Sequence, residues 1–223
     1  MSRSLRSKLA PIYEGILPAF FDRPAFEETR ATCDDCAMCP KKEASIVASI
    51  HFDPETKCCT YHPTLPNYLA GAVFADPSSD LDEGRRRLRQ KLAARIGVTP
   101  RWLAAPRKFL VHLEASRLHA FGRARSMRCP LYDEGRCTIW KHRESVCSTF
   151  FCKHDGGGYA RAFWDALKKW TFVLESALTE YAVRQIAPNT TEPRVGKNKM
   201  TLEDLEDRPP PPEEYAQIGR AHV

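Results

Sequence analysis

Nine cysteines constrain this chain of 223 residues more than any other feature. They form two groups that are separated by a long stretch without cysteine, namely Cys33, Cys36, Cys39, Cys58 and Cys59, followed by Cys129, Cys137, Cys147 and Cys152. Each group contains enough thiols for a four-ligand metal site. In a reducing compartment, clustered cysteines indicate metal ligands or redox groups rather than a disulfide framework.

The spacing of the first group favours a metal site, because Cys33, Cys36 and Cys39 are separated from one another by two residues each. Three thiolates on one tight loop resemble a ferredoxin-type iron–sulfur loop, which a remote cysteine next to proline completes. Both Cys39 and Cys129 precede a proline. A zinc site accepts the same four thiolates, so the two cofactors remain alternatives, with a slight preference for an iron–sulfur cluster.

Basic residues adjoin several cysteines, and we expect them to lower thiol pKa values and to offset the charge of bound thiolates. These residues are Lys57, Arg128, Arg136, Arg143 and Lys153. The alternative is that the cysteines are ordinary buried residues, which pack like small hydrophobic side chains. Four histidines near the cysteines are alternative ligands or proton carriers, although an ordinary role in loops is favoured. They are His51, His62, His142 and His154.

Hydrophobic periodicity predicts helices, with the cysteines in the loops between them. One helix is expected from about Ser79 to Arg95, ending at Gly97. A longer amphipathic helix is expected after the last cysteine, with its apolar face formed by Phe163, Leu167, Trp170, Leu174, Leu178 and Tyr181. Residues Thr64 to Ala75 suit a short buried helix, and Ile46 to Phe52 alternate weakly, as in a strand.

The fold prediction is therefore mainly α: a small irregular domain stapled by metal, with cysteine-bearing loops and a long C-terminal helix. This domain is expected over residues 1–187. Residues 188–223 form an acidic and proline-rich tail with four prolines from Pro209 to Pro212, and we expect this tail to be disordered. Residues 217–223 are consistent with translated read-through of a sequencing adapter, so we treat them as an artefact.

Charge is concentrated in the middle of a chain whose net charge is +6. From Arg85 to Arg128 there are thirteen Lys or Arg residues and one acid, Glu114. A basic block over residues 85–128 attracts phosphates, nucleic acid or an acidic partner, or it is simply a solvated helix face. The longest apolar stretch, Tyr68 to Ala75, is too short to cross a membrane, so we expect a cytoplasmic protein without a membrane span.

The cysteine pattern resembles that of the YkgJ-type cysteine-cluster family, which is described as a zinc- or iron-chelating domain and includes flagellin lysine N-methylases. The resemblance rests on the spacing of Cys33, Cys36 and Cys39, on Cys129-Pro130-Leu131, on Gly135 to Trp140, and on the spacing from Arg143 to Cys147 and Cys152. It implies that these seven cysteines are metal ligands. Pro40 stands where the family has a fourth cysteine, and Cys58 or Cys59 would replace that ligand.

These observations predict a metal-binding protein, with zinc or an iron–sulfur cluster in a structural or redox role and with a protein partner. One alternative is a metal-dependent group-transfer enzyme similar to the lysine methylases. The sequence contains neither a glycine-rich phosphate loop nor a recognisable methyltransferase turn, and we assign no catalytic residue. A second alternative is a nucleic-acid-associated factor that binds through residues 85–128.

Overall fold

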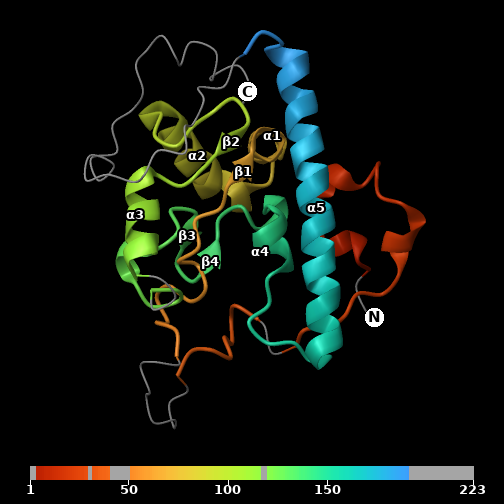
Figure 1. The fold of residues 1–223 in the computed structure, drawn as a ribbon, viewed down its shortest axis with the longest axis vertical. Coiled ribbons are helices and arrows are strands. Elements are labelled where there is room, and N and C mark those ends of the chain that lie inside the picture. The colour runs from red at the N-terminus through yellow and green to blue at the C-terminus, as the bar shows by residue number, and fades with distance from the viewer. Residues whose placement is uncertain (1–3, 30–31, 41–50, 117–119, 191–223) are drawn as a thin grey trace.

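The computed structural model describes residues 4–29, 32–40, 51–116 and 120–190, and this part of the chain is mainly helical (Figure 1). The prediction of a mainly α fold is confirmed. None of the described helices combines the length and the apolar character needed to cross a lipid bilayer. The predicted tail falls outside the described residues from residue 191 onward, as do residues 46–50 of the predicted strand.

The regular elements are short, with one exception. The α-helices are α1 (Asn67–Ala75), α2 (Asp82–Ala94), α3 (Arg107–Ser116), α4 (Ser145–Thr149) and α5 (Gly157–Ile186). The strands are β1 (Leu65–Pro66), β2 (Trp102–Leu103), β3 (Tyr132–Asp133) and β4 (Arg136–Cys137). The 3-10 helices are η1 (Arg6–Lys8), η2 (Pro11–Tyr13), η3 (Ala19–Asp22), η4 (Ser79–Leu81), η6 (Arg125–Met127) and η7 (Trp140–His142).

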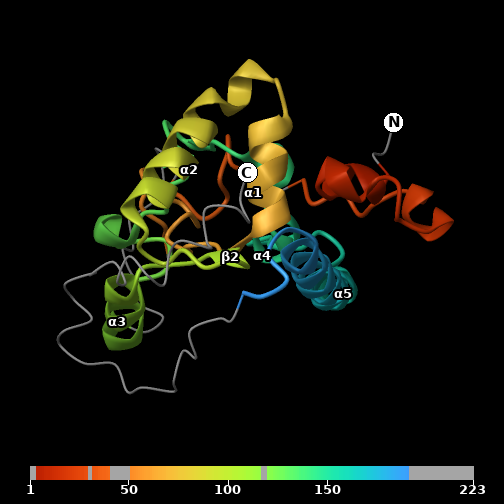
Figure 2. The same ribbon diagram turned by 90° about the horizontal axis from the view of Figure 1, so that it is seen from above.

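Helix α5 is the longest described helix, and the N-terminal segment, α1 and α4 lie beside it (Figures 1 and 2). The N-terminal 3-10 helices lie along one side of it, and α1 and α4 lie along the other. The N-terminal segment contributes Leu5, Tyr13 and Phe21 to the same hydrophobic core that contains Trp164 and Leu167 of α5. Burial of these side chains removes a large apolar area from water and fixes the segment that leads to the first cysteines.

The buried face of α5 differs from the expected stripe of large apolar residues. Its buried residues are Ala160, Trp164, Leu167, Thr171, Glu175, Thr179 and Val183, whereas Trp170 and Tyr181 are 40% and 63% exposed. The predicted face was therefore wrong at these two positions. The reason is that polar residues lie on the buried side: Glu175 accepts hydrogen bonds from Ser145 on α4, and the Thr171 hydroxyl donates to carbonyl oxygens of α5 itself.

The most connected of these partners is Glu175. Its carboxyl group accepts hydrogen bonds from the backbone N and the Oγ of Ser145, at 2.6 and 2.7 Å. The Tyr13 hydroxyl also hydrogen bonds to this carboxyl group, and it lies 2.7 Å from the hydroxyl of Tyr68. One buried network therefore joins the N-terminal segment, α1, α4 and α5.

The predicted helices between the two cysteine groups are both present. Helix α2 ends at Ala94, Arg95 caps it in the left-handed conformation with a φ of 60°, and Gly97 has a φ of 66°. Helix α1 occupies most of the range from Thr64 to Ala75, and the preceding strand β1 pairs antiparallel with β2, Leu65 opposite Leu103. The described part of the predicted strand, His51 and Phe52, is not in a strand.

Strands β3 and β4 form a tight hairpin within the second cysteine group. Glu134 and Gly135 connect them with φ values of 40° and 87°. Two consecutive residues with positive φ match the right-handed twist of a two-residue hairpin, and such a turn favours glycine. The hairpin places Cys137 on β4, and its other arm follows Cys129.

Candidate metal centre

All nine cysteines lie in the described part of the chain, and all are free thiols. Cys33, Cys36 and Cys39 lie in the turns of one irregular loop, and Cys58 and Cys59 lie in turns before β1. In the second group, Cys129 precedes β3, Cys137 ends β4, Cys147 is inside α4, and Cys152 follows α4.

Three contacts join the two groups, although they are far apart in the sequence. The backbone N of Cys129 donates to the carbonyl oxygen of Cys59 at 2.7 Å. The Nζ of Lys57 donates to the carbonyl oxygens of Cys33, at 2.6 Å, and Gly135, at 3.3 Å. The thiol of Cys152 hydrogen bonds to the sulfur of Cys36. The early and late cysteine loops are therefore neighbours in the fold.

Electrostatic interactions connect further thiols of the two groups with one another. Cys33 interacts with Cys58, and both interact with Cys137. Cys137 and Cys129 are in turn coupled to Cys147 inside α4. A chain of mutually interacting thiols thus runs from the first loop to α4.

Within the described ranges, no three Cys, His, Asp or Glu side chains come together in the geometry of an assembled metal site. The direct thiol contacts are pairwise instead. Cys36 hydrogen bonds to Cys152 and to Cys39, and Cys58 hydrogen bonds to Cys59. Binding one ion by four of these sulfurs would require rotation of thiol side chains on loops whose backbones already lie together.

Burial, rather than neighbouring cations, dominates the ionisation of most of these thiols. Desolvation raises the pKa of Cys33, Cys137 and Cys147, and it raises the pKa of Cys129 to about 12. The expectation that nearby cations lower the pKa of the thiols was therefore wrong for Cys129, Cys137 and Cys147. Cys36 is the exception, because the hydrogen bond from Cys152 lowers its pKa.

Two of the five expected cations lie near enough to the buried thiols to affect their ionisation. Lys57 and Arg143 both favour the thiolate of Cys33, although desolvation outweighs them. The other three side chains, Arg128, Arg136 and Lys153, are exposed to solvent. The sequence thus identified basic residues next to the cysteines, but it could not show that three of these side chains point to solvent instead of to the thiols.

Arg143 is a cation that interacts with several of these thiols. Its guanidinium carbon lies 3.4 Å from the centroid of the Trp140 ring. Its Nε donates to the carbonyl oxygen of Trp140 at 3.0 Å, and its Nη1 donates to that of Cys147 at 2.9 Å. The guanidinium interacts with Cys137, Cys147, Cys33 and Cys58. This arrangement places a fixed positive charge where several thiolates would accumulate negative charge.

Two buried carboxyl groups that the sequence analysis missed support the cysteine loops. Glu144 caps α4 by accepting from the backbone N of Val146 and of Cys147, at 2.6 and 2.9 Å. Glu28 accepts from the Nε1 of Trp164 at 2.7 Å and from the backbone N of Asp155 at 2.6 Å. The charged character of both residues gives no signal of burial, because glutamate is normally exposed.

The histidines have partners outside the thiol cluster, which agrees with their favoured interpretation as ordinary residues. The Nε2 of His142 lies 3.0 Å from Asp76, and the Nδ1 of His62 lies 3.2 Å from the carbonyl oxygen of Pro63. The Nδ1 of His154 lies 3.5 Å from Glu28. The carbonyl oxygen of His51 accepts a hydrogen bond from the Nε of Arg123 at 3.2 Å.

A cleft of about 360 Å³ opens beside the cluster and has Cys152 on its wall. Its lining residues are Val146, Thr149, Phe150, Phe151, Cys152, His154, Arg161, Trp164, Asp165 and Lys168. Cys152 is half-buried and borders this cleft.

Much of the basic block over residues 85–128 is engaged in ion pairs within the fold. Arg87 binds Asp133 at 2.7 Å, Arg101 binds Glu180 at 2.8 Å, and Arg125 binds Asp53 at 2.6 Å. Arg85 and Arg86 bind Asp82 and Glu83 on the same helix, at 2.5 Å each. These cations therefore stabilise contacts between elements or within α2, which weakens the interpretation of the block as a nucleic-acid surface.

Comparison with known proteins adds no relative. No protein-family model matches the chain, and neither a curated protein nor a solved structure matches it. Any functional inference therefore depends on the residues and contacts of this chain.

Proposed function

We propose that the protein binds a metal centre, either zinc or an iron–sulfur cluster, through its cysteines. The centre has a structural or electron-carrying role in a protein that acts with a protein partner. The observation that supports this proposal is the contact between the two cysteine groups: the backbone N of Cys129 donates to the carbonyl oxygen of Cys59, and the Nζ of Lys57 bridges the carbonyl oxygens of Cys33 and Gly135. Burying several thiols side by side has little structural value by itself, but it provides the all-sulfur donor set that these metals prefer.

The proposed ligands are eight of the nine cysteines, enough for two four-sulfur sites: Cys33, Cys36, Cys39, Cys58, Cys129, Cys137, Cys147 and Cys152. Cys58 is preferred over Cys59 because it interacts with Cys33, Cys36, Cys137 and Cys152, four thiols from both groups. Cys59 packs partly buried against the hydrophobic core, as Cys137 does, so the preference for Cys58 depends on its interactions with the other thiols.

Charge and protonation are consistent with this role. Four thiolates around one zinc ion or one cluster leave a net negative charge, and the guanidinium of Arg143 is placed to offset it. The thiols with raised pKa values must lose their protons when a metal binds, so loading releases protons and depends on pH.

The first experiment is anaerobic purification of the full chain, followed by elemental analysis and an absorption spectrum. Brown protein with iron and acid-labile sulfide identifies a cluster, and colourless protein with stoichiometric zinc identifies a zinc site. Protein that contains neither metal, and takes up neither zinc nor iron with sulfide after reduction, contradicts the proposal.

A matched pair of variants tests the ligand assignment. Cys58→Ala should lower the metal content per chain, whereas Cys59→Ala should leave it unchanged, because Cys58 interacts with thiols of both groups. Cys36→Ala and Cys152→Ala should each lower it as well. Equal metal content in all four variants would exclude the assignment.

A further inference from the structure

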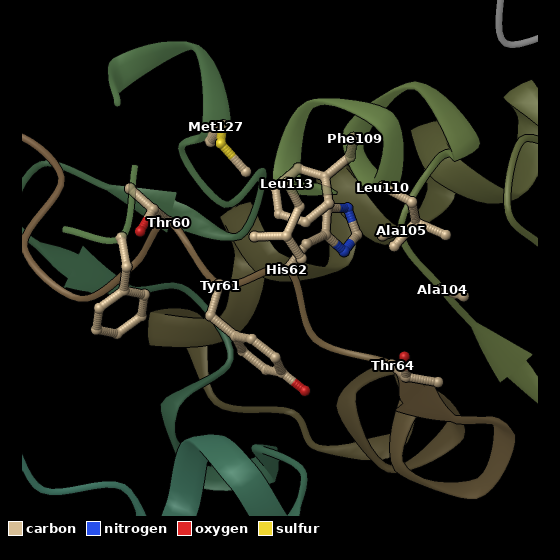
Figure 3. A pocket seen from close by; sticks show the side chains of 11 residues that line it. Thr60, Tyr61, His62, Thr64, Ala104, Ala105, Phe109, Leu110, Leu113 and Met127 are labelled. Atoms are coloured by element: carbon tan, nitrogen blue, oxygen red, sulfur yellow. The ribbon is translucent and has the colours of Figure 1, made fainter. Parts of the chain in front are cut away.

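A second cavity, of about 230 Å³, lies between the segment that follows Cys59 and helix α3 (Figure 3). It is lined by Thr60, Tyr61, His62, Thr64, Ala104, Ala105, Phe109, Leu110, Leu113, Phe121 and Met127. None of the nine cysteines lines it. Its walls are mostly apolar, and Leu110 and Leu113 on α3 remain 40% and 41% exposed although they border it.

The polar group at the centre of this cavity is the imidazole of His62, which lies among Phe109, Leu110 and Leu113 in Figure 3. The residue is only 9% exposed. Its Nδ1 lies 3.2 Å from the carbonyl oxygen of Pro63. A carbonyl oxygen can only accept a hydrogen bond, so Nδ1 carries the proton.

The other ring nitrogen is therefore an acceptor. Burial, followed by the charge of Lys91, lowers the pKa of His62 to about 4, so the ring is neutral near pH 7 and Nε2 has a lone pair. Within the described residues, Nε2 makes no hydrogen bond. The Thr60 hydroxyl, by contrast, already accepts from the backbone N of Gly122 at 2.7 Å.

The size of the cavity and its lining limit what fits. A dry apolar cavity of about 150 Å³ holds a benzene molecule, so this one has room for a bicyclic aromatic molecule of about ten heavy atoms. The ring of Phe109 lies 5.5 Å from the ring of His62, centroid to centroid, so one wall of the pocket is itself aromatic. The walls also carry the hydroxyl groups of Thr60, Tyr61 and Thr64, but they are mostly apolar, and together with the acceptor on His62 they favour a ligand that is aromatic and carries a hydrogen-bond donor.

We propose that this pocket binds a small bicyclic aromatic molecule through one N–H or O–H group that donates to the Nε2 of His62. Indole has this chemistry and this size. Benzofuran has nearly the same shape, but an oxygen acceptor replaces the N–H group, so it would set a lone pair against the lone pair of Nε2.

The test is calorimetric titration of the full chain, as purified with its metal, with indole and then with benzofuran. We expect indole to bind roughly tenfold more tightly, because a buried hydrogen bond contributes on the order of 1 kcal/mol and the unpaired acceptor adds a penalty. No binding of indole at millimolar concentration, or equal affinities for the two molecules, overturns the proposal.

Two variants and a control separate the pocket from the fold. His62→Phe keeps an aromatic ring but removes the acceptor, so it should abolish the preference for indole while benzofuran still binds. Leu113→Trp should fill the cavity and prevent binding of both molecules, whereas Glu114→Trp introduces the same ring at the neighbouring residue, which does not line the cavity, and should leave binding intact. Unchanged binding by Leu113→Trp, or a preference for indole that persists in His62→Phe, contradicts the assignment.

Discussion

Glu175 is a buried residue whose hydrogen bonds join several elements. Burial of its carboxyl group also lowers the stability of the fold at the pH values where the group is ionised. Its carboxyl group is 3% exposed and accepts two hydrogen bonds from Ser145. Desolvation raises its pKa to about 7 although these bonds oppose the shift, and the neighbouring charge of Glu144 adds to it. The folded protein therefore holds a proton that the unfolded chain has already released above about pH 4.5.

This proton predicts a pH dependence of stability. Between about pH 4.5 and pH 7 the folded state binds more protons than the unfolded state, so the contribution of Glu175 to the free energy of unfolding falls as the pH rises. Glu175→Gln removes this titration. We expect its stability relative to the original protein to increase by on the order of 2 kcal/mol from pH 5 to pH 8, measured by urea unfolding at both values.

The control is Glu180→Gln on the same helix. Hydrogen bonds from Arg101 and Arg184 lower the pKa of Glu180, so its ionisation does not change between pH 5 and pH 8. The stability of this variant relative to the original protein should be constant over that range. A constant difference for Glu175→Gln as well would show that this carboxyl group titrates normally.

Arg143 carries a second prediction for a single residue. Arg143→Met keeps much of the stem that packs near Trp140 but removes the charge that faces Cys33, Cys58 and Cys137. Loss of a partner that supports metal ligands usually costs roughly 10–100-fold in metal affinity. We therefore expect a loss in this range, measured by competition with a chromophoric chelator.

Arg136→Met is the matched control for this substitution. Arg136 directly precedes Cys137, but its side chain is exposed, so its removal should change metal affinity little. If Arg136→Met and Arg143→Met weaken binding equally, general charge rather than the buried position of Arg143 governs the site.

At the scale of elements, helix α2 packs closely against the loop that contains Thr138, and the contact is at Gly84. A Cβ atom at this position would lie 2.4 Å from the carbonyl oxygen of Thr138 and 2.7 Å from the Cγ2 of Ile139. Both neighbours directly follow Cys137, so the first turn of α2 supports the loop that carries this thiol. Gly84→Ala should lower the free energy of unfolding by roughly 1–3 kcal/mol, because the backbone must move apart. Chemical denaturation measures this change.

Gly71, in the interior of α1, provides the contrasting substitution. A Cβ atom there has no neighbour within 4 Å, and alanine is favoured over glycine inside a helix. Gly71→Ala should therefore raise the free energy of unfolding by roughly 0.5–1 kcal/mol. If both substitutions have the same effect, the close contact between α2 and the Thr138 loop does not control stability.

An element could be predicted from the sequence where the residues that determine it lie within the element itself. Helix α2 was predictable because its boundaries are set by Gly97 and by an apolar stripe within one segment. The N-terminal 3-10 helices have no such periodicity, and their place against α5 depends on contacts with distant residues. The burial of Glu28 and Glu144 was missed for the same reason, since a polar residue is buried only where remote partners satisfy it.

For the molecule as a whole, the cysteine-bearing loops lie next to one another in a region with little regular secondary structure. The described strands are only two residues long, and the loops from Cys33 to Cys39 and from Thr56 to Tyr61 have little regular hydrogen bonding of their own. Sequence spacing identified the nine candidate thiols. It could not identify their neighbours, because the contacts of Cys36 with Cys152 and of Cys59 with Cys129 span most of the domain.

The contrast between the helices packed in the core and the loops that carry the cysteines predicts how the protein responds to metal removal. Coordination by four thiolates contributes directly to folding free energy, so a chelator should loosen the loops that carry the ligands. Helices α1, α2 and the C-terminal half of α5 are held by the hydrophobic core and by Glu175, and they should change less. In hydrogen exchange of metal-loaded and metal-free protein, residues 33–39, 56–61 and 129–137 should lose protection first. Equal protection of these segments in both forms would show that the loops are held without metal, and the proposed structural role of the centre would then be wrong.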